Sequence, residues 1–194
     1  LRLSLVSGGL AIVVLYVFAS PVMELMYVNS NSAIYIKVMA PFFIFYYFQG
    51  PLQATLQALD LAKAAMINSF IGNFIKTGAI FILATRPSLG IMGAALAIVI
   101  GMMLVTLLHF STIVKVISYS FYIKDYIKSG VTMVLSGIGG HYFYQMFLID
   151  SSLAIRTLAA IGVTSFIYII LLFIFKLLTK EEVKRIPFIG PKLA

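Results

Sequence analysis

Residues 61–85 read LAKAAMINSFIGNFIKTGAIFILAT, an apolar run that is long enough to cross a lipid bilayer. One lysine, Lys76, lies well inside this run. An ionisable side chain within a membrane span costs about 2.5–3.5 kcal/mol or more, so such a group is usually buried in a helix bundle or faces water. Lys76 therefore indicates a hydrophilic interior within a membrane protein.

The composition of the whole chain supports a membrane location. Of the 194 residues, 62% are hydrophobic and 10% are charged, which leaves too few polar residues to coat a soluble surface. Lysine and arginine number 14 against 6 acidic residues, and most of these cations lie in loops and near the C-terminus, as in membrane proteins. We expect their partner to be anionic membrane lipid, and we expect no nucleic acid partner.

Residues typical of catalytic and metal sites are scarce. The chain has no cysteine, and its two histidines stand apart, so we expect no metal site and no cofactor. Paired carboxylates, a nucleophile motif and a glycine-rich phosphate loop are also missing from the sequence. We therefore expect that the protein is not an enzyme, and we interpret His109 and His141 as hydrogen-bonding groups between helices.

Six apolar segments follow one another along the chain. The first contains Pro21, which predicts a bend near Ser20 and Pro21. The fourth carries glycine and alanine at three- and four-residue spacing, which predicts a face for close helix packing. The predicted fold class is an all-α polytopic membrane protein with six transmembrane helices, at residues 3–27, 38–59, 61–85, 89–113, 129–149 and 152–178.

Residues 115–128, KVISYSFYIKDYIK, differ in kind from the six segments. Apolar and aromatic residues recur at helical spacing, and Lys115, Lys124 and Lys128 supply positive charge. This pattern is typical of an amphipathic segment that lies in the membrane interface. We expect a linker here, and we expect residues 179–194 to form a basic tail at the membrane surface.

Polar side chains line one face of the second predicted helix. Gln49, Gln53 and Gln57 recur at four-residue spacing around Pro51. In lipid these amides must find partners, so they either hydrogen-bond to neighbouring helices or line a water-filled substrate pathway. Pro51 removes a backbone donor at mid-membrane, and we expect it to kink the helix and act as a hinge.

Asn73 and Lys76 share a face of the third predicted helix. At about 1.5 Å per residue, Asn73 should lie level with Gln49, and Asn68 level with Gln53, on adjacent antiparallel helices. Lys76 either contacts a substrate in a cavity or is satisfied by backbone carbonyls and a neighbouring amide. The candidate cavity-lining residues are Lys76, Asn73, Gln49, Gln53 and Gln57.

Lysines and arginines are distributed unevenly about the six predicted helices. Ten of them fall on the side that holds both termini, three fall on the other side, and Lys76 lies within the membrane. Cytoplasmic loops of membrane proteins carry the excess of positive charge. We therefore expect a multi-pass protein of the cell membrane with both termini in the cytoplasm.

Four stretches of the sequence resemble a known family. They are FFIFYYFQGPLQATLQALDLAKAA at 42–65, NSFIGNFIKTGAIFIL at 68–83, LGIMGAALAIVIG at 89–101 and RIPFIGPKL at 185–193. In this order and spacing they resemble the C-terminal part of stage V sporulation protein B-like members of the multidrug/oligosaccharidyl-lipid/polysaccharide flippase superfamily. The resemblance covers essentially the whole chain.

The resemblance implies a fold and a function. Members of the superfamily have two six-helix lobes, commonly followed by two extra helices. These fourteen-helix, MATE-like proteins move lipid-linked precursors across the membrane by alternating access. By analogy, residues 1–114 resemble the last four helices of the second lobe, and residues 129–178 resemble the extra pair. The chain would then be a fragment whose partners are the missing N-terminal lobe and a lipid-linked glycan, with a peptidoglycan precursor as the leading candidate.

Two alternatives to a glycan flippase remain open. A cation-coupled multidrug exporter of the same superfamily would rely on an intramembrane carboxylate, and Glu24, the only acidic residue within the predicted helices, lies near an end. A non-transporting scaffold for cell-wall assembly would tolerate apolar replacement of the polar residues.

Overall fold

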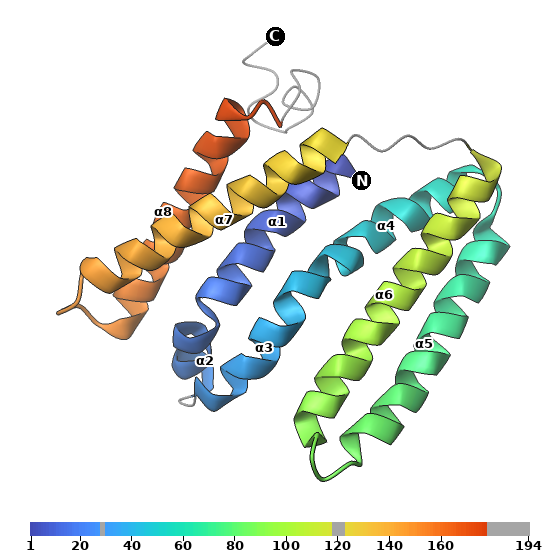
Figure 1. Ribbon diagram of the computed structural model, residues 1–194, viewed down its shortest axis with the longest axis horizontal. Helices are drawn as coiled ribbons and strands as arrows, with labels where there is room; N and C mark the ends of the chain where they lie inside the picture. The colour runs from blue at the N-terminus through green and yellow to red at the C-terminus, as the bar shows by residue number, and fades with distance from the viewer. Residues whose placement is uncertain (28–29, 118–122, 178–194) are drawn as a thin grey trace. The chain divides into compact units, whose positions relative to one another are not determined.

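The computed structural model describes residues 1–27, 30–117 and 123–177. Every regular element in these ranges is helical, so the predicted all-α class is confirmed. The chain divides into two compact units, Leu1–Phe121 and Tyr122–Ala194, whose helices are labelled in Figure 1.

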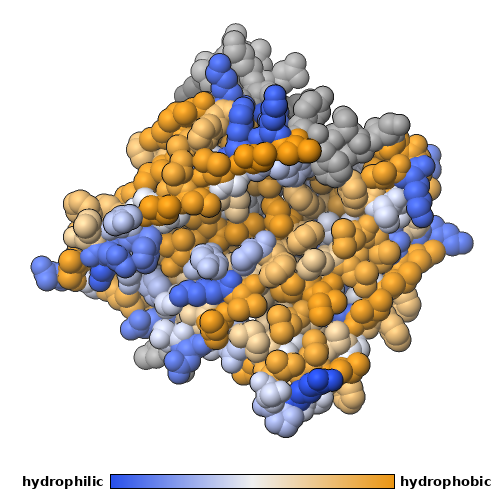
Figure 2. Space-filling model, in the orientation of Figure 1, coloured by the Kyte–Doolittle hydropathy of each residue, from blue (hydrophilic) through white to orange (hydrophobic). Residues whose placement is uncertain are grey.

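Three described helices are long and apolar enough to cross a membrane, namely α5 (Ala62–Ala84), α6 (Gly90–Val116) and α8 (Leu153–Ile174). The bent pair α1 (Arg2–Val17) and α2 (Ala19–Tyr27) makes a fourth if it is counted as one span. Figure 2 shows apolar side chains over much of the visible face. The described chain is an all-helical membrane protein with three or up to four such spans.

The first predicted helix bends near Ser20 and Pro21, as expected. α1 ends at Val17, α2 begins at Ala19, and the helix axis turns by 71° between them. A proline ring crowds the carbonyl four residues before it and cannot donate to that carbonyl, and four residues before Pro21 is Val17. The bend therefore begins at the residue on which the proline acts.

The second predicted helix consists of two helices joined by a 3-10 turn. α3 (Ala33–Met39) leads through the turn Ala40–Phe42 into α4 (Phe43–Ala58). Pro41 lies in this turn, where its missing N–H costs least. α4 then continues through Pro51. The change of helix type falls at Pro41, and the role of Pro51 as a hinge stays a prediction.

Helices of the first unit pack side by side. α4 packs against α1 and against α6, and α5 packs mainly against α6. In Figure 1, α5 lies at the outer edge of this unit. Nearly half of the α6 span is buried, whereas very little of the α5 span is buried. α5 therefore has a wide uncovered surface.

A tight turn connects α4 to α5. Asp60 adopts the left-handed backbone conformation with φ of 58°, and the N–H of Leu61 donates to the carbonyl of Leu56 over 2.8 Å. This is the Schellman arrangement at the end of a helix, with the first residue after the cap in the left-handed region. The turn adjoins a core cluster made of Leu52, Leu56, Ala65 and Ile113.

The second unit is a helical hairpin of α7 (Ile123–Met146) and α8. Small and hydroxyl-bearing residues form the contact, which lets the two backbones approach closely. Ser152 caps the start of α8 by accepting a hydrogen bond from the N–H of Ile155. The buried small and polar residues are Ser129, Thr132, Ser136, Gly137 and Gly140 on α7 and Thr157, Ala160 and Thr164 on α8.

The predicted linker, residues 115–128, is largely helical where it is described. α6 continues to Val116, and α7 already begins at Ile123. Asp125 lies in the first turn of α7, where its negative charge stabilises the helix by interacting with the positive end of the helix dipole. α7 therefore starts six residues before the predicted helix. Residues 118–122 and the predicted basic tail, 179–194, lie outside the described residues.

Candidate functional site

Small residues on α5 and α6 face larger groups on the opposite helix. A Cβ added to Gly72 of α5 would overlap the side chain of Val105, and one added to Gly93 of α6 would overlap the carbonyl of Leu83. Gly93, Ala97 and Gly101 are all buried. The close-packing face predicted for residues 89–113 is thus confirmed, and α5 is its neighbour.

Lys76 belongs to this helix contact. Its stem lies over Gly101 of α6, where an added Cβ would come within 2.6 Å of the lysine Cβ and 2.8 Å of its Cδ. Its ammonium donates to Asn73 Oδ1 over 2.7 Å. Lys76 is half-buried and Asn73 is exposed. Packing therefore fixes the stem, while the charged end lies at the uncovered edge of α5.

A hydrogen-bond cluster joins α5 to α6 two helical turns from Lys76. Asn68 Nδ2 lies 3.2 Å from the carbonyl oxygen of Leu108, 2.9 Å from Thr112 Oγ1 and 3.5 Å from His109 Nδ1. On the other side of the imidazole, Ser69 Oγ lies 3.4 Å from His109 Nε2. The imidazole is 1% exposed. This cluster anchors the first half of α5 to α6.

The carbonyl of Leu108 fixes the orientation of the Asn68 amide. Turning the amide over would place its oxygen against that carbonyl, so Nδ2 must face α6. The His109 ring lies between Asn68 Nδ2 and Ser69 Oγ, at 3.5 and 3.4 Å. His109 is therefore a hydrogen-bonding group between helices, as predicted. The same interpretation is wrong for His141, which bonds to Gln145 of its own helix at 2.9 Å.

Replacing Asn68 by aspartate should destabilise the contact between α5 and α6. A carboxylate oxygen would face the carbonyl of Leu108 without a hydrogen between them, which costs about 1–3 kcal/mol. We expect a lower Tm for the full-length protein in detergent. Ser69→Ala is the control, because it removes only the long contact to His109 and should shift Tm much less. Equal shifts for the two variants would contradict the assigned amide orientation.

Gln49 hydrogen-bonds to α6. Its Nε2 donates to the carbonyl of Met102 over 3.0 Å. Close by, the hydroxyl of Thr106 donates to the carbonyls of Phe45 and Met102 at 2.7 and 2.8 Å. α6 lies between α4 and α5 and accepts the hydrogen bond of Gln49, whereas Asn73 bonds to Lys76 of its own helix. That Asn73 lies level with Gln49, and Asn68 level with Gln53, stays a prediction.

The five candidate residues therefore fall into three groups. Gln49 is bonded into the α4 and α6 contact, and Asn73 and Lys76 form a pair at the edge of α5. Gln53 and Gln57 are exposed on α4. Sequence reasoning missed the contact of Lys76 with Gly101, although the small-residue spacing had marked Gly101 as part of a packing face.

The chain is similar to two curated proteins of Bacillus subtilis (strain 168). It is 55% identical to stage V sporulation protein B over 190 residues, which cover 98% of this chain and 37% of that protein. It is 28% identical to sporulation protein YkvU over 113 residues, which cover 58% of this chain and 25% of that protein. The chain thus spans well under half the length of these relatives. No protein-family model and no solved structure matches the chain.

Proposed function

We propose that the full-length protein is a flippase. The proposal starts from the finding that this chain is a close homologue of part of stage V sporulation protein B. The flippase moves a lipid-linked glycan precursor across the cell membrane by alternating access. The relative supports a sporulation-related membrane protein, and the apolar helices support the membrane location. A peptidoglycan precursor is the leading substrate candidate.

The observation that carries the proposal is the position of the Lys76 ammonium. α5 ends at Ala84, about 12 Å beyond Lys76 at 1.5 Å per residue, which is farther than a lysine side chain extends. An ammonium at this depth needs water, another polar segment or an anion near it. The pyrophosphate of a lipid-linked glycan is such an anion, and it pairs well with an ammonium.

Exposed amides on α4 and α5 are suited to the glycan part of this substrate. Gln53, Gln57 and Asn73 are exposed, and each amide offers two donors and one acceptor group. Sugar hydroxyls both donate and accept, so they match amides better than they match apolar side chains. We propose that the remaining part of the full-length protein supplies a second lobe that encloses these residues.

We infer that the chain crosses the membrane six times. α7 has 24 residues, which span about 36 Å, and it packs along α8. α3, the turn at Pro41 and α4 together cover residues 33–58, a similar length. With α1 and α2 counted as one span, six crossings result. The uneven distribution of lysine and arginine then favours cytoplasmic termini.

Single cysteines test this topology in a full-length protein without other cysteines. Lys63 and Asp150 are both exposed, and the six-crossing arrangement places them on opposite sides of the membrane. In intact cells, a membrane-impermeant thiol reagent should label Asp150→Cys at least ten times more than Lys63→Cys, and permeabilised cells should label both. Preferential labelling of Lys63→Cys in intact cells would show that the termini are outside the cell. Equal labelling of the two variants would contradict the prediction of six membrane crossings.

The flippase proposal is tested in vesicles that contain the full-length protein. A fluorescent lipid-linked saccharide pyrophosphate should exchange between leaflets faster than in protein-free vesicles. Ion-driven export of a lipophilic cation without saccharide transport would favour the exporter instead, although Glu24 is exposed on the short helix α2 and gives that alternative little support. Transport of neither compound by a folded protein would favour a scaffold.

A further inference from the structure

We propose that one end of the α7 and α8 hairpin binds the phosphate of an anionic phospholipid headgroup. Three lysines form this site, and we call them the lysine clamp. The proposal concerns the second unit alone and does not depend on the flippase function. The members of the lysine clamp are Lys124, Lys128 and Lys176.

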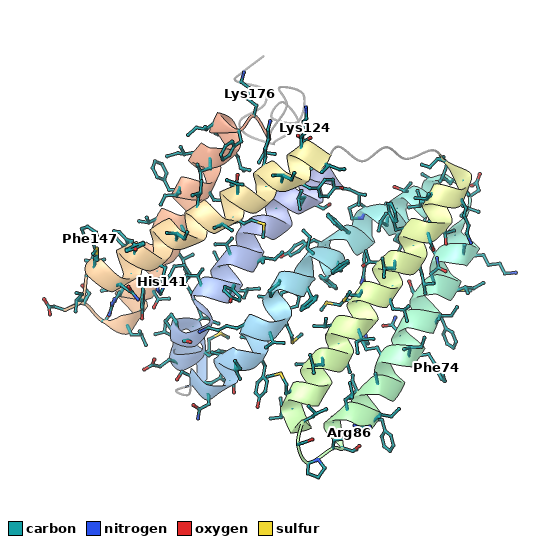
Figure 3. The ribbon with its side chains drawn as sticks, in the orientation of Figure 1. Phe74, Arg86, Lys124, His141, Phe147 and Lys176 are labelled. Carbon is teal, nitrogen blue, oxygen red and sulfur yellow. The ribbon has the colours of Figure 1, made fainter. Side chains whose placement is uncertain are left out.

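The lysine clamp brings together cations from both helices. Lys128 Nζ, from α7, donates to the carbonyl of Phe175 at the end of α8 over 3.3 Å, and Lys176 is the next residue. Lys124 precedes Lys128 by four residues, so the two lie on one face of α7. Figure 3 shows Lys124 and Lys176 at the same end of the hairpin. Three lysines therefore lie at the end of the hairpin where α7 begins and α8 ends.

The backbone of Lys176 is unusual for a lysine. Its φ of 53° lies in the left-handed region. Its N–H donates to the carbonyl of Phe173, and the N–H of Leu177 donates to the carbonyl of Leu172. These bonds define a Schellman motif, and the residue at this position is usually glycine, because a side chain is strained there. The backbone at this position alone would favour glycine over lysine.

The position of the lysine clamp matches the level of lipid headgroups. α8 is a candidate membrane span of 22 residues, about 33 Å long, and the hydrocarbon layer is about 30 Å thick. Lys176 follows its last turn directly. Ile123 and Ile127 are 66% and 61% exposed beside the lysines on α7. Exposed apolar residues next to ammonium groups fit a ligand with both an acyl chain and a phosphate.

The charge at this end of the hairpin also favours an anion. In the first turns of α7 and the last turn of α8, as far as the structure describes them, Asp125 is the single acidic residue against the three lysines. The net charge of these described turns is therefore positive. A bare helix C-terminus would itself repel phosphate, but Lys128 covers the carbonyl of Phe175 with its ammonium.

Native mass spectrometry of the full-length protein tests the proposal. The wild-type protein, extracted from vesicles with equal amounts of phosphatidylglycerol and phosphatidylcholine, should retain phosphatidylglycerol at least five-fold more often. Lys124→Gln with Lys176→Gln should reduce this ratio to about one, while Lys128 stays to cap α8. The control is Lys63→Gln with Lys115→Gln, which removes two exposed lysines of the first unit and should keep the ratio.

Lys176→Gly separates lipid binding from helix capping. Glycine accepts the left-handed backbone, so Tm in detergent without lipid should stay equal or rise, while retention of phosphatidylglycerol should fall several-fold. Unchanged retention in Lys176→Gly and in the double variant would overturn the proposal. Inorganic phosphate should not raise the Tm of the wild-type protein as phosphatidylglycerol does, and an equal rise would show an ion site in place of a lipid site.

Discussion

Exchanging Lys76 for methionine should lower transport per folded molecule of the full-length protein by about 10- to 100-fold. A hydrogen bond to a charged group contributes about 1.5–3 kcal/mol, and 1.4 kcal/mol corresponds to ten-fold in rate. Methionine keeps most of the stem that lies over Gly101, and removal of a charge from the membrane lowers its desolvation cost. The folded protein should therefore stay abundant. Transport is measured in vesicles and divided by the folded fraction.

Two further variants separate a substrate contact from a structural role. Lys76→Arg keeps the charge and should recover part of the transport, limited by the different shape of the guanidinium. Lys63→Met removes an exposed lysine from the first turn of the same helix and should leave transport unchanged. If abundance falls in step with transport in Lys76→Met, the lysine is structural. If transport per folded molecule is unchanged, Lys76 does not contact the substrate.

Gly72→Leu should remove most of the folded protein. A Cβ at position 72 would overlap the side chain of Val105 and lie 3.3 Å from its backbone nitrogen, and a leucine adds three more carbons. Overpacking a tight contact usually costs about 1–3 kcal/mol, and here the backbone of α6 would have to move as well. We expect a Tm several degrees lower and a large loss of folded protein, measured by size-exclusion chromatography in detergent.

The matched control for this variant lies on the same helix. A Cβ added to Gly78 meets nothing within 4 Å, so Gly78→Leu should keep wild-type abundance. The destabilisation caused by Gly72→Ala should be relieved by Val105→Ala, because this second substitution removes the side-chain atoms that the new Cβ would overlap. The double variant should therefore have a higher Tm than Gly72→Ala alone. Equal losses in Gly72→Leu and Gly78→Leu would contradict the packing described for α5.

The span that carries Lys76 was predictable because residues close to its two ends in the sequence determine where the helix begins and ends. The apolar run 61–85 lies between Asp60 and Pro87, and α5 covers Ala62–Ala84. The break in the preceding helix was less predictable, since both Pro41 and Pro51 remove a backbone donor. Which proline changes the helix type depends on packing against α1 and α6, and the sequence pattern does not contain that information.

The candidate site was predictable in its residues but not in its contacts. A lysine inside an apolar run can be recognised from the sequence as a candidate site residue, and so can amides spaced four residues apart. The contact of Lys76 with Gly101 and the bond of Gln49 to Met102 depend on α6 lying between α4 and α5. Helical spacing identifies a face of one helix, whereas the neighbour of that face follows from the order in which the helices pack.

The contact of α5 with α6 has a consequence for biosynthesis. α5 emerges from the ribosome first, and its Lys76 stem and Gly72 then lack the surface of α6 that covers them. The turn that follows is short, with the N–H groups of Leu89 and Gly90 both donating to the carbonyl of Arg86 at 3.0 and 2.9 Å. α5 should therefore wait at the translocon and enter the bilayer together with α6, as a preassembled helical pair.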